Sequence, residues 1–180
     1  MILNEARDYV RMAYDVMVET VDTREIGKTL AIPSEYWQRD WINEKTSLSV
    51  SRREDVEDCD RNQSGYDLRS IGGLRIQSKF RSSSLHLENT RRNSQKNQGA
   101  ASTSGHVAYS LGECDVFCIT RPNGEYNTTG AWEILAIPAA ELEDPKNPGF
   151  IRRRIPKTIE NKYVGRAKEV LENAEKTTCI

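Results

Sequence analysis

The sequence lacks several features that would place it in a specialised class of proteins. No apolar run approaches the roughly 18 residues that a membrane span needs. The N-terminal segment carries acidic residues where a signal or transit peptide would have none. The four cysteines, Cys59, Cys114, Cys118 and Cys179, form neither a CxxC pair nor a dense disulfide spacing. We therefore expect a cytoplasmic protein with reduced thiols and no membrane partner.

The chain also lacks a strong net charge, but its charges are unevenly distributed. The 180 residues are 37% hydrophobic and 29% charged with a net charge of −1, which is typical of one soluble globular domain without internal repeats. Residues 71–105 nevertheless hold 6 Lys/Arg against 1 Asp/Glu, whereas residues 1–70 hold 10 against 15. Because exposed charges are screened beyond about 10 Å, a local basic segment attracts a phosphate backbone whatever the total charge.

The hydrophobic spacing predicts an α/β domain with a mixed central sheet flanked by helices. The capping signals at Ile32-Pro33-Ser34 predict that the second helix begins there. The expected elements are helices over 2–21, 32–45 and 157–176, strands over 47–51, 114–120 and 131–137, and a hairpin over 65–81. We divide the single domain, 1–180, into an N-terminal helical extension (1–32), a core (33–140) and a C-terminal strand and helix (141–180).

The hairpin GYDLRSIGGLRIQSKFR, residues 65–81, allows two registers, and the hydrophobic pattern selects one. A two-residue turn would mix polar and apolar side chains on both faces. A three-residue loop over 71–73, with a glycine in the left-handed conformation, pairs Leu68 with Ile76 and gathers the apolar side chains on one face. On the other face Asp67 then lies opposite Gln77, at a Cβ separation of about 5 Å, with Lys79 on the diagonal.

This polar face has the composition of a metal site. The Asp67 carboxylate, the Gln77 amide oxygen and the main-chain carbonyl of Ser78 are hard oxygen ligands of the kind that Mg²⁺ prefers. Lys79, on the same face, can lie beside a metal-bound water or a scissile phosphate. The combination suits phosphodiester hydrolysis by in-line displacement.

The order helix, strand, strand with Asp, strand with an acidic-or-Gln/x/Lys tripeptide resembles the PD-(D/E)xK nuclease superfamily, which includes many restriction endonucleases. The match consists of Glu35 on the second helix, LSVS as the first strand, Asp67 after Gly65-Tyr66, and the tripeptide Gln77-Ser78-Lys79. It covers roughly residues 33–140. Tyr66 stands where the family has Pro, and Gln77 replaces the usual acid.

The resemblance implies a restriction endonuclease-like core and a Mg²⁺-dependent endonuclease that cuts double-stranded DNA, sequence-specifically as restriction or homing enzymes do. Mn²⁺ would substitute for Mg²⁺, and a homodimer would cut both strands, with the helix over 2–21 as a candidate interface. The implied catalytic residues are Asp67, Gln77, Lys79 and Glu35, and the implied metal ligands are Asp67, Gln77, Ser78 and Glu35.

The glutamine at position 77 leaves two other interpretations open. A neutral amide holds a divalent ion less tightly than a carboxylate, so Glu35 must supplement the site, with Asp58 and Asp60 as fallbacks. The first alternative is a catalytically inactive nucleic-acid-binding module with the same fold. The second is a structural or assembly protein whose polar hairpin face is merely solvated.

The polar tract after the hairpin is the candidate for DNA recognition, because its side chains can make bidentate bonds to base edges as well as phosphate contacts. The alternative is a solvated loop. The candidate DNA-binding residues are Arg81, Arg91, Arg92, Asn93, Gln95, Lys96, Asn97 and His106. Tyr109 could also position a water or contact a phosphate, whereas Asp115 is expected to have a structural role and Cys114 and Cys118 to be core residues.

Overall fold

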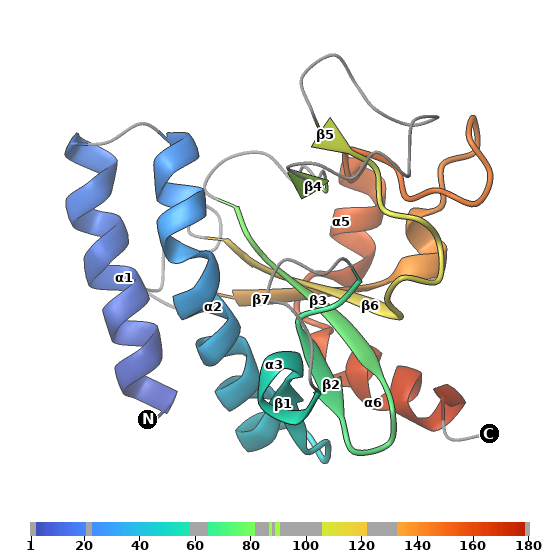
Figure 1. Ribbon diagram of the computed structural model, residues 1–180, viewed down its shortest axis with the longest axis horizontal. Helices are drawn as coiled ribbons and strands as arrows, with labels where there is room; N and C mark the ends of the chain where they lie inside the picture. The colour runs from blue at the N-terminus through green and yellow to red at the C-terminus, as the bar shows by residue number, and fades with distance from the viewer. Residues whose placement is uncertain are drawn as a thin grey trace.

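A five-stranded mixed sheet flanked by helices forms the centre of the protein (Figure 1). The computed structural model describes residues 3–20, 23–57, 65–81, 87, 89–90, 106–121 and 133–178. The strand order is β1-β2-β3-β6-β7, and a second, two-stranded sheet pairs β4 with β5. Only the β3–β6 pair of the large sheet is parallel, and its other pairs are antiparallel. The predicted α/β class with a mixed sheet between helices is confirmed.

The elements follow one another as helix pair, hairpin, central strands and C-terminal helices. The helices are α1 (Leu3–Thr20), α2 (Thr23–Lys45), α3 (Arg53–Val56), α5 (Lys157–Tyr163) and α6 (Ala167–Thr178), with a 3-10 helix η1 (Ala139–Leu142). The strands are β1 (Val50–Arg52), β2 (Leu68–Ser70), β3 (Arg75–Phe80), β4 (Asn89–Thr90), β5 (His106–Val107), β6 (Val116–Arg121) and β7 (Glu133–Pro138).

The prediction that the second helix begins at Ile32-Pro33-Ser34 is wrong, because α2 begins at Thr23 and carries Pro33 in its interior. A proline inside a helix costs about 3 kcal/mol. The N-terminal half of α2 compensates by burying Ile26 and Leu30 against Val10 of α1, since each such side chain contributes about 2 kcal/mol. The expected boundary between residues 32 and 33 therefore falls inside one helix.

The two long helices lie side by side along the left edge of the molecule in Figure 1. Helix α2 also packs on β3 and β6. Its Gln38 amide donates to the Thr120 hydroxyl (2.8 Å) and to the Lys79 carbonyl (3.3 Å). These bonds fix the position of α2 over the middle of the sheet.

The hairpin has the register that the hydrophobic pattern predicted. Leu68 pairs with Ile76, and the loop is closed by a bond from the Ser70 N–H to the Leu74 carbonyl (3.0 Å). Gly73 has φ of 96°, a left-handed conformation that glycine adopts without strain. Leu68, Leu74 and Ile76 are fully buried in the main core. The hydrophobic pattern thus determined both the register and the inward face.

The buried strands β6 and β7 confirm the predictions for 114–120 and 131–137, displaced by one or two residues. Every residue of β6 is buried, as expected for a central strand. Arg121, at its end, forms a buried ion pair with Glu160 of α5 (2.8 Å). The sequence Pro122-Asn123-Gly124 predicts a turn between these two strands, and it lies outside the described residues.

The C-terminal helix, predicted as one piece over 157–176, is two helices. Gly165 adopts φ of 72°, and Val164 at the C-cap of α5 has extended backbone angles, so the chain turns between Tyr163 and Ala167. Helix α6 then packs against β7, with Val170 and Leu171 buried. Gly165 ends the first helix with a left-handed turn. The sequence did not predict this turn because the residues on both sides of it have helical periodicity.

Two smaller predictions need adjustment. The first strand lies at 50–52 instead of 47–51, and the loop after it opens with the short helix α3. No helix in the described ranges is long and apolar enough to cross a membrane.

Candidate active site

Asp67 and Gln77 meet at the open end of the hairpin, as the register predicted. The Asp67 N–H donates to the Ile76 carbonyl (3.0 Å), which continues the β2–β3 ladder by one residue. One carboxylate oxygen of Asp67, Oδ2, accepts the Ser78 N–H at 2.8 Å and also a short bond from the Gln77 amide nitrogen. The Asp67 carboxylate therefore accepts a backbone N–H of β3 that a main-chain carbonyl would otherwise accept. It also accepts a hydrogen bond from a side chain of the same strand.

The orientation of the Gln77 amide differs from the expected one. Its Nε2 donates both to Asp67 Oδ2 and to the Ser78 carbonyl oxygen, the latter at 3.3 Å, so a hydrogen-bond donor occupies the space between two acceptors. We predicted that the amide oxygen would point there as a ligand. The amide nitrogen is the end of the Gln77 side chain that satisfies both oxygens, because neither oxygen can donate.

The donor set at this point fits a hard divalent cation. A carboxylate oxygen and a main-chain carbonyl oxygen converge on one position, and rotation of the Gln77 amide would bring a third oxygen to it. Gln77 and Ser78 are 4% and 5% exposed, so these polar groups are held in a fixed, mostly dry environment.

Glu35 on α2 approaches the same place from the helix side. Burial and the negative charge of Asp67 raise the pKa of Glu35 to about 7, although Arg52 acts in the opposite direction. The Arg52 guanidinium lies 3.3 Å from Glu35 Oε2 and also pairs with Glu54. Burial likewise raises the pKa of Asp67, against the lowering effect of Lys79. Two partly buried carboxylates thus face each other, an arrangement that a bound cation would stabilise.

Lys79 lies on the same face of β3 as Gln77, and its ammonium lies over the ring of Tyr109. Its ammonium is 5.0 Å from the centre of the Tyr109 ring, and it lowers the pKa of Asp67 through its charge. Tyr109 is 1% exposed and packs edge-to-face on Phe117, with ring centres 5.4 Å apart. Burial raises the pKa of the phenol, while the charge of Lys79 and its hydrogen bond lower it. The ammonium is therefore held in place by a rigid neighbour.

The predicted DNA-binding residues fall mostly where the structure gives no description. Arg91, Arg92, Asn93, Gln95, Lys96 and Asn97 lie outside the described residues, as do the fallback acids Asp58 and Asp60. His106 belongs to β5, opposite Thr90 of β4. Arg81 follows β3 directly and donates to the Phe80 carbonyl (2.8 Å). Of this set, the structure brings Arg81 close in sequence and space to the candidate site.

Asp115 has the structural role that was expected of it. Its Oδ2 accepts the Arg75 N–H at 2.8 Å, and its two oxygens bind the Arg75 guanidinium at 2.8 and 3.1 Å. Cys114 and Cys118 are buried thiols of the core, at 3% and 0% exposure. In the part of the chain that is described, no three His, Cys, Asp or Glu side chains come together as a metal cluster.

Three further residues reach the site, and the sequence analysis named only one of them, Tyr109, as a residue that could position a water or contact a phosphate. Arg52, Tyr109 and Gln38 reach it from β1, from the segment before β6 and from α2. Gln38 follows Glu35 by three residues, a spacing that places both on one side of a helix, and this was the available signal. Arg52 and Tyr109 depend on long-range packing that local patterns do not reveal.

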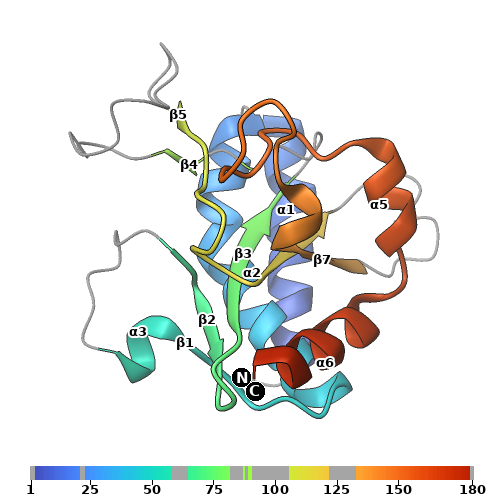
Figure 2. The ribbon, with the colours of Figure 1, turned by 90° about the vertical axis from the view of Figure 1, so that its right-hand side faces the viewer.

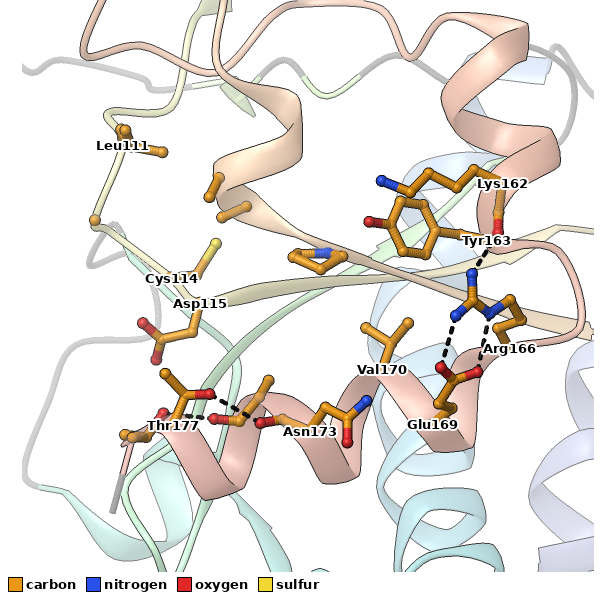
Figure 3. Close-up of a pocket in the computed structure, with 16 residues that line it drawn as sticks. Leu111, Cys114, Asp115, Lys162, Tyr163, Arg166, Glu169, Val170, Asn173 and Thr177 are labelled. Carbon is orange, nitrogen blue, oxygen red and sulfur yellow. Dashed lines mark hydrogen bonds and ion pairs between the residues drawn. The ribbon is translucent and has the colours of Figure 1, made fainter. Parts of the chain in front are cut away.

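A pocket of about 720 Å³ lies elsewhere, between the start of β6 and the C-terminal helices (Figure 3). None of Asp67, Gln77, Lys79 and Glu35 lines it. The charged side chains at its rim are paired: Arg166 binds Glu169 at 2.6 and 2.9 Å, and Lys162 binds Glu141 at 2.9 Å. The pocket therefore lies apart from the candidate site, and these four charged groups already form ion pairs.

Comparisons with known proteins do not bear on the assignment. The chain matches no family model, and neither a search of curated proteins nor a search of solved structures found a match. The function must be argued from the site itself.

Proposed function

We propose that the protein is a metal-dependent DNA endonuclease with a restriction endonuclease-like core, of the PD-(D/E)xK type. The observation that carries the proposal is the convergence of Asp67 Oδ2 and the Ser78 carbonyl on one position, with Lys79 on the same strand as Ser78 and Glu35 within electrostatic reach of Asp67. Carboxylate, carbonyl and ammonium groups arranged in this way are suited to phosphodiester hydrolysis.

Each residue has a separate task in this proposal. Asp67, Ser78 and the amide oxygen of Gln77 would hold a Mg²⁺ or Mn²⁺ ion, with Glu35 as a further ligand. When bound, the ion supplies a Lewis acid and an activated water. Lys79, fixed against Tyr109, orients the attacking water and stabilises the charge that develops on the phosphate.

The substrate that we propose is double-stranded DNA, cut at specific sequences. A domain of 180 residues with one such centre would cut both strands as a homodimer. The outer face of α1 supports this, because Tyr9, Met12 and Val16 form an apolar stripe with 58%, 69% and 68% exposure. Sedimentation analysis of the wild type and of Met12→Asp tests the dimer: the wild type should sediment as a dimer and the variant as a monomer.

Cleavage of supercoiled plasmid and of phage DNA tests the enzymatic proposal. Wild-type protein with Mg²⁺ or Mn²⁺ should give discrete fragments, whereas EDTA or Lys79→Ala should abolish them. The Lys168→Ala variant serves as the control, because it also removes one lysine but on an exposed position of α6. Absence of cleavage on every DNA with either metal would refute the proposal.

One observation favours the second candidate, a nucleic-acid-binding module without catalysis. The Gln77 amide donates to Asp67 and Ser78, and in this orientation it fills the proposed metal position with a nitrogen. If the amide keeps that orientation in solution, the protein should bind duplex DNA equally well with and without Mg²⁺ and should leave it intact. Metal-dependent cleavage would exclude this candidate.

A further inference from the structure

Arg52, a buried arginine at the end of β1, lies within electrostatic reach of both carboxylates of the candidate site. Its side chain is 4% exposed. The N–H of the next residue, Arg53, donates to the Asp67 carbonyl oxygen (2.8 Å), which ties this end of β1 to the hairpin. The charge of Arg52 lowers the pKa of both Glu35 and Asp67. Arg52 therefore belongs to the site, but it cannot be a metal ligand, because a guanidinium only donates hydrogen bonds.

The Arg52 guanidinium binds two consecutive residues of α2. Its Nη2 lies 3.3 Å from Glu35 Oε2, and its Nη1 donates to the Tyr36 hydroxyl (2.5 Å). The Tyr36 ring also contacts the guanidinium, with 4.3 Å between the ring centre and Cζ. These contacts need N–H groups that diverge in a fixed plane, which a lysine ammonium does not have. The guanidinium therefore fixes the Glu35 carboxylate through one of its two oxygens.

Glu54 of α3 also pairs with Nη2 of Arg52, so two glutamates share one guanidinium. Figures 1 and 2 show α3 next to β1, which pairs with β2 of the hairpin. The side chains of Glu35 and Glu54 are 18% and 21% exposed, whereas Arg52 is almost completely covered. One positive charge that is shared between two carboxylates does not neutralise both of them. Arg52 can therefore hold Glu35 in place while the carboxylate still attracts a cation.

We propose that Arg52 is a positioning residue that holds Oε2 of Glu35 so that the carboxylate faces the position on which Asp67 and Ser78 converge, an inference that rests on the proposed function. Groups that orient a metal ligand from behind commonly contribute a factor of about 10 to 100 to metal affinity, because they fix the ligand before the ion arrives. Arg52 itself touches neither the ion nor the DNA in this arrangement.

A titration with Mn²⁺ followed by electron paramagnetic resonance measures the effect of Arg52 without requiring cleavage. Arg52→Lys keeps the positive charge but loses the planar fork, so Mn²⁺ should bind about tenfold more weakly than to the wild type. The titration is carried out at pH 8, above the pKa of Glu35, which is about 7, so that most of this carboxyl is ionised.

A double-mutant cycle with Glu35→Gln separates positioning from a general structural role. Glu35→Gln alone should weaken Mn²⁺ binding. If Arg52 acts through Glu35, adding Arg52→Lys to Glu35→Gln should change the affinity by less than about twofold. A structural contribution of Arg52 to β1 would instead weaken binding by the same factor with and without Glu35→Gln.

Tyr36→Phe is a second, milder test, which also serves if Arg52→Lys does not fold. It keeps Arg52 and the aromatic ring but removes the hydroxyl that accepts from Nη1. Mn²⁺ should bind about threefold more weakly to this variant, in line with the loss of one hydrogen bond to a charged group that orients the ligand. The loss should disappear when Glu35→Gln is added.

The matched control is Arg121→Lys, which makes the same change in another buried ion pair. Arg121 binds Glu160 of α5 at 2.8 Å, and the two side chains are 9% and 5% exposed. Arg121→Lys should lower the free energy of unfolding, as Arg52→Lys does, but should keep the wild-type affinity for Mn²⁺. Urea denaturation of the two variants shows whether their losses of stability are comparable.

The contrary results are distinguishable. Wild-type Mn²⁺ affinity in Arg52→Lys and Tyr36→Phe, or in Glu35→Gln, would overturn the positioning role and leave the other ligands of the proposed metal centre intact. Equal losses with and without Glu35→Gln, or an equal loss in Arg121→Lys, would also overturn it, because the effect would not pass through Glu35. No saturable Mn²⁺ binding by the wild type would overturn the proposed metal centre and the role of Arg52 together.

Discussion

The two ends of strand β3 each carry a pair of oppositely charged residues, and the two pairs are built differently. At the start of the strand, Asp115 receives the backbone N–H and the guanidinium of Arg75, so both of its oxygens have partners. Toward the other end, the charge of Lys79 lowers the pKa of Asp67, but the Lys79 ammonium lies over the Tyr109 ring. The first pair is about one-third exposed, at 36% and 28%, whereas the second lies beside buried Gln77 and Ser78.

This difference distinguishes a structural ion pair, Arg75 with Asp115, from the candidate site around Asp67. A carboxylate that is fully hydrogen-bonded gains little from a cation, whereas two partly buried carboxylates with raised pKa values gain much. The polar residues that recur along the hairpin therefore have two purposes. Arg75 ties the hairpin to β6, and Asp67, Gln77 and Lys79 form the candidate reaction centre.

The largest difference between the two ends should appear in catalysis. Asp67→Asn should lower plasmid cleavage by about a thousandfold, because it removes charge at the metal position. Asp115→Asn, the same chemical change at the other end of the strand, should leave cleavage within a few-fold of wild type. Rates under single-turnover conditions measure both effects. Similar losses of cleavage in Asp67→Asn and Asp115→Asn would contradict the assignment of a reaction centre to Asp67 and a structural role to Asp115.

The free energy of unfolding should depend on pH because of Glu35. The pKa of Glu35 rises from 4.5 to about 7 on folding, so between these values the unfolded chain releases a proton that the folded protein keeps. The free energy of unfolding therefore falls as pH rises through this range, by about 2 kcal/mol. Glu35→Gln should remove most of this fall, which urea denaturation at pH 5 and pH 8 without divalent metal would reveal. Parallel pH profiles for variant and wild type would contradict the interpretation.

Metal affinity should increase when position 77 regains a carboxylate. Gln77→Glu should bind Mg²⁺ about tenfold more tightly, because a charged oxygen replaces a neutral amide. Isothermal titration calorimetry measures the change, and the double variant Asp67→Asn/Gln77→Glu should lose it. An unchanged affinity in Gln77→Glu would show that this side chain does not face the ion.

The smallest effect belongs to the structural pair. Arg75→Met should lower the free energy of unfolding by about 1 kcal/mol, in line with a partly exposed, hydrogen-bonded ion pair. Cleavage should stay within a few-fold of wild type. Urea denaturation measures the change in the free energy of unfolding, and the plasmid assay measures cleavage. A loss of cleavage above about tenfold would show that Arg75 also belongs to the site.

The hairpin was predictable because its alternation of apolar residues tolerates only one register. Leu68 opposite Ile76 follows from burial, and it brings Asp67 to Gln77 automatically. Local signals failed where tertiary packing dominated. Burial of Ile26 and Leu30 carries α2 through Pro33, and a left-handed Gly165 divides the last helix.

The composition of the candidate site was only partly accessible from the sequence. Glu35 was anticipated as a site residue from the family resemblance, which places an acidic residue on the second helix. It does lie within electrostatic reach of Asp67. Arg52 and Tyr109 were not anticipated as partners of Glu35 and Lys79, because these contacts join distant segments of the chain. The donor orientation of the Gln77 amide depends on which acceptors surround it, and a residue pattern does not contain that information.

The most direct test of the central claim is a titration of the protein with Mn²⁺, followed by electron paramagnetic resonance. We expect a saturable site in the wild type and in Asp115→Asn, and its loss in Asp67→Asn. Mg²⁺ should compete for the same site. Equal Mn²⁺ uptake by wild type and Asp67→Asn, or no uptake by either, would contradict the claim that this end of β3 is a metal centre.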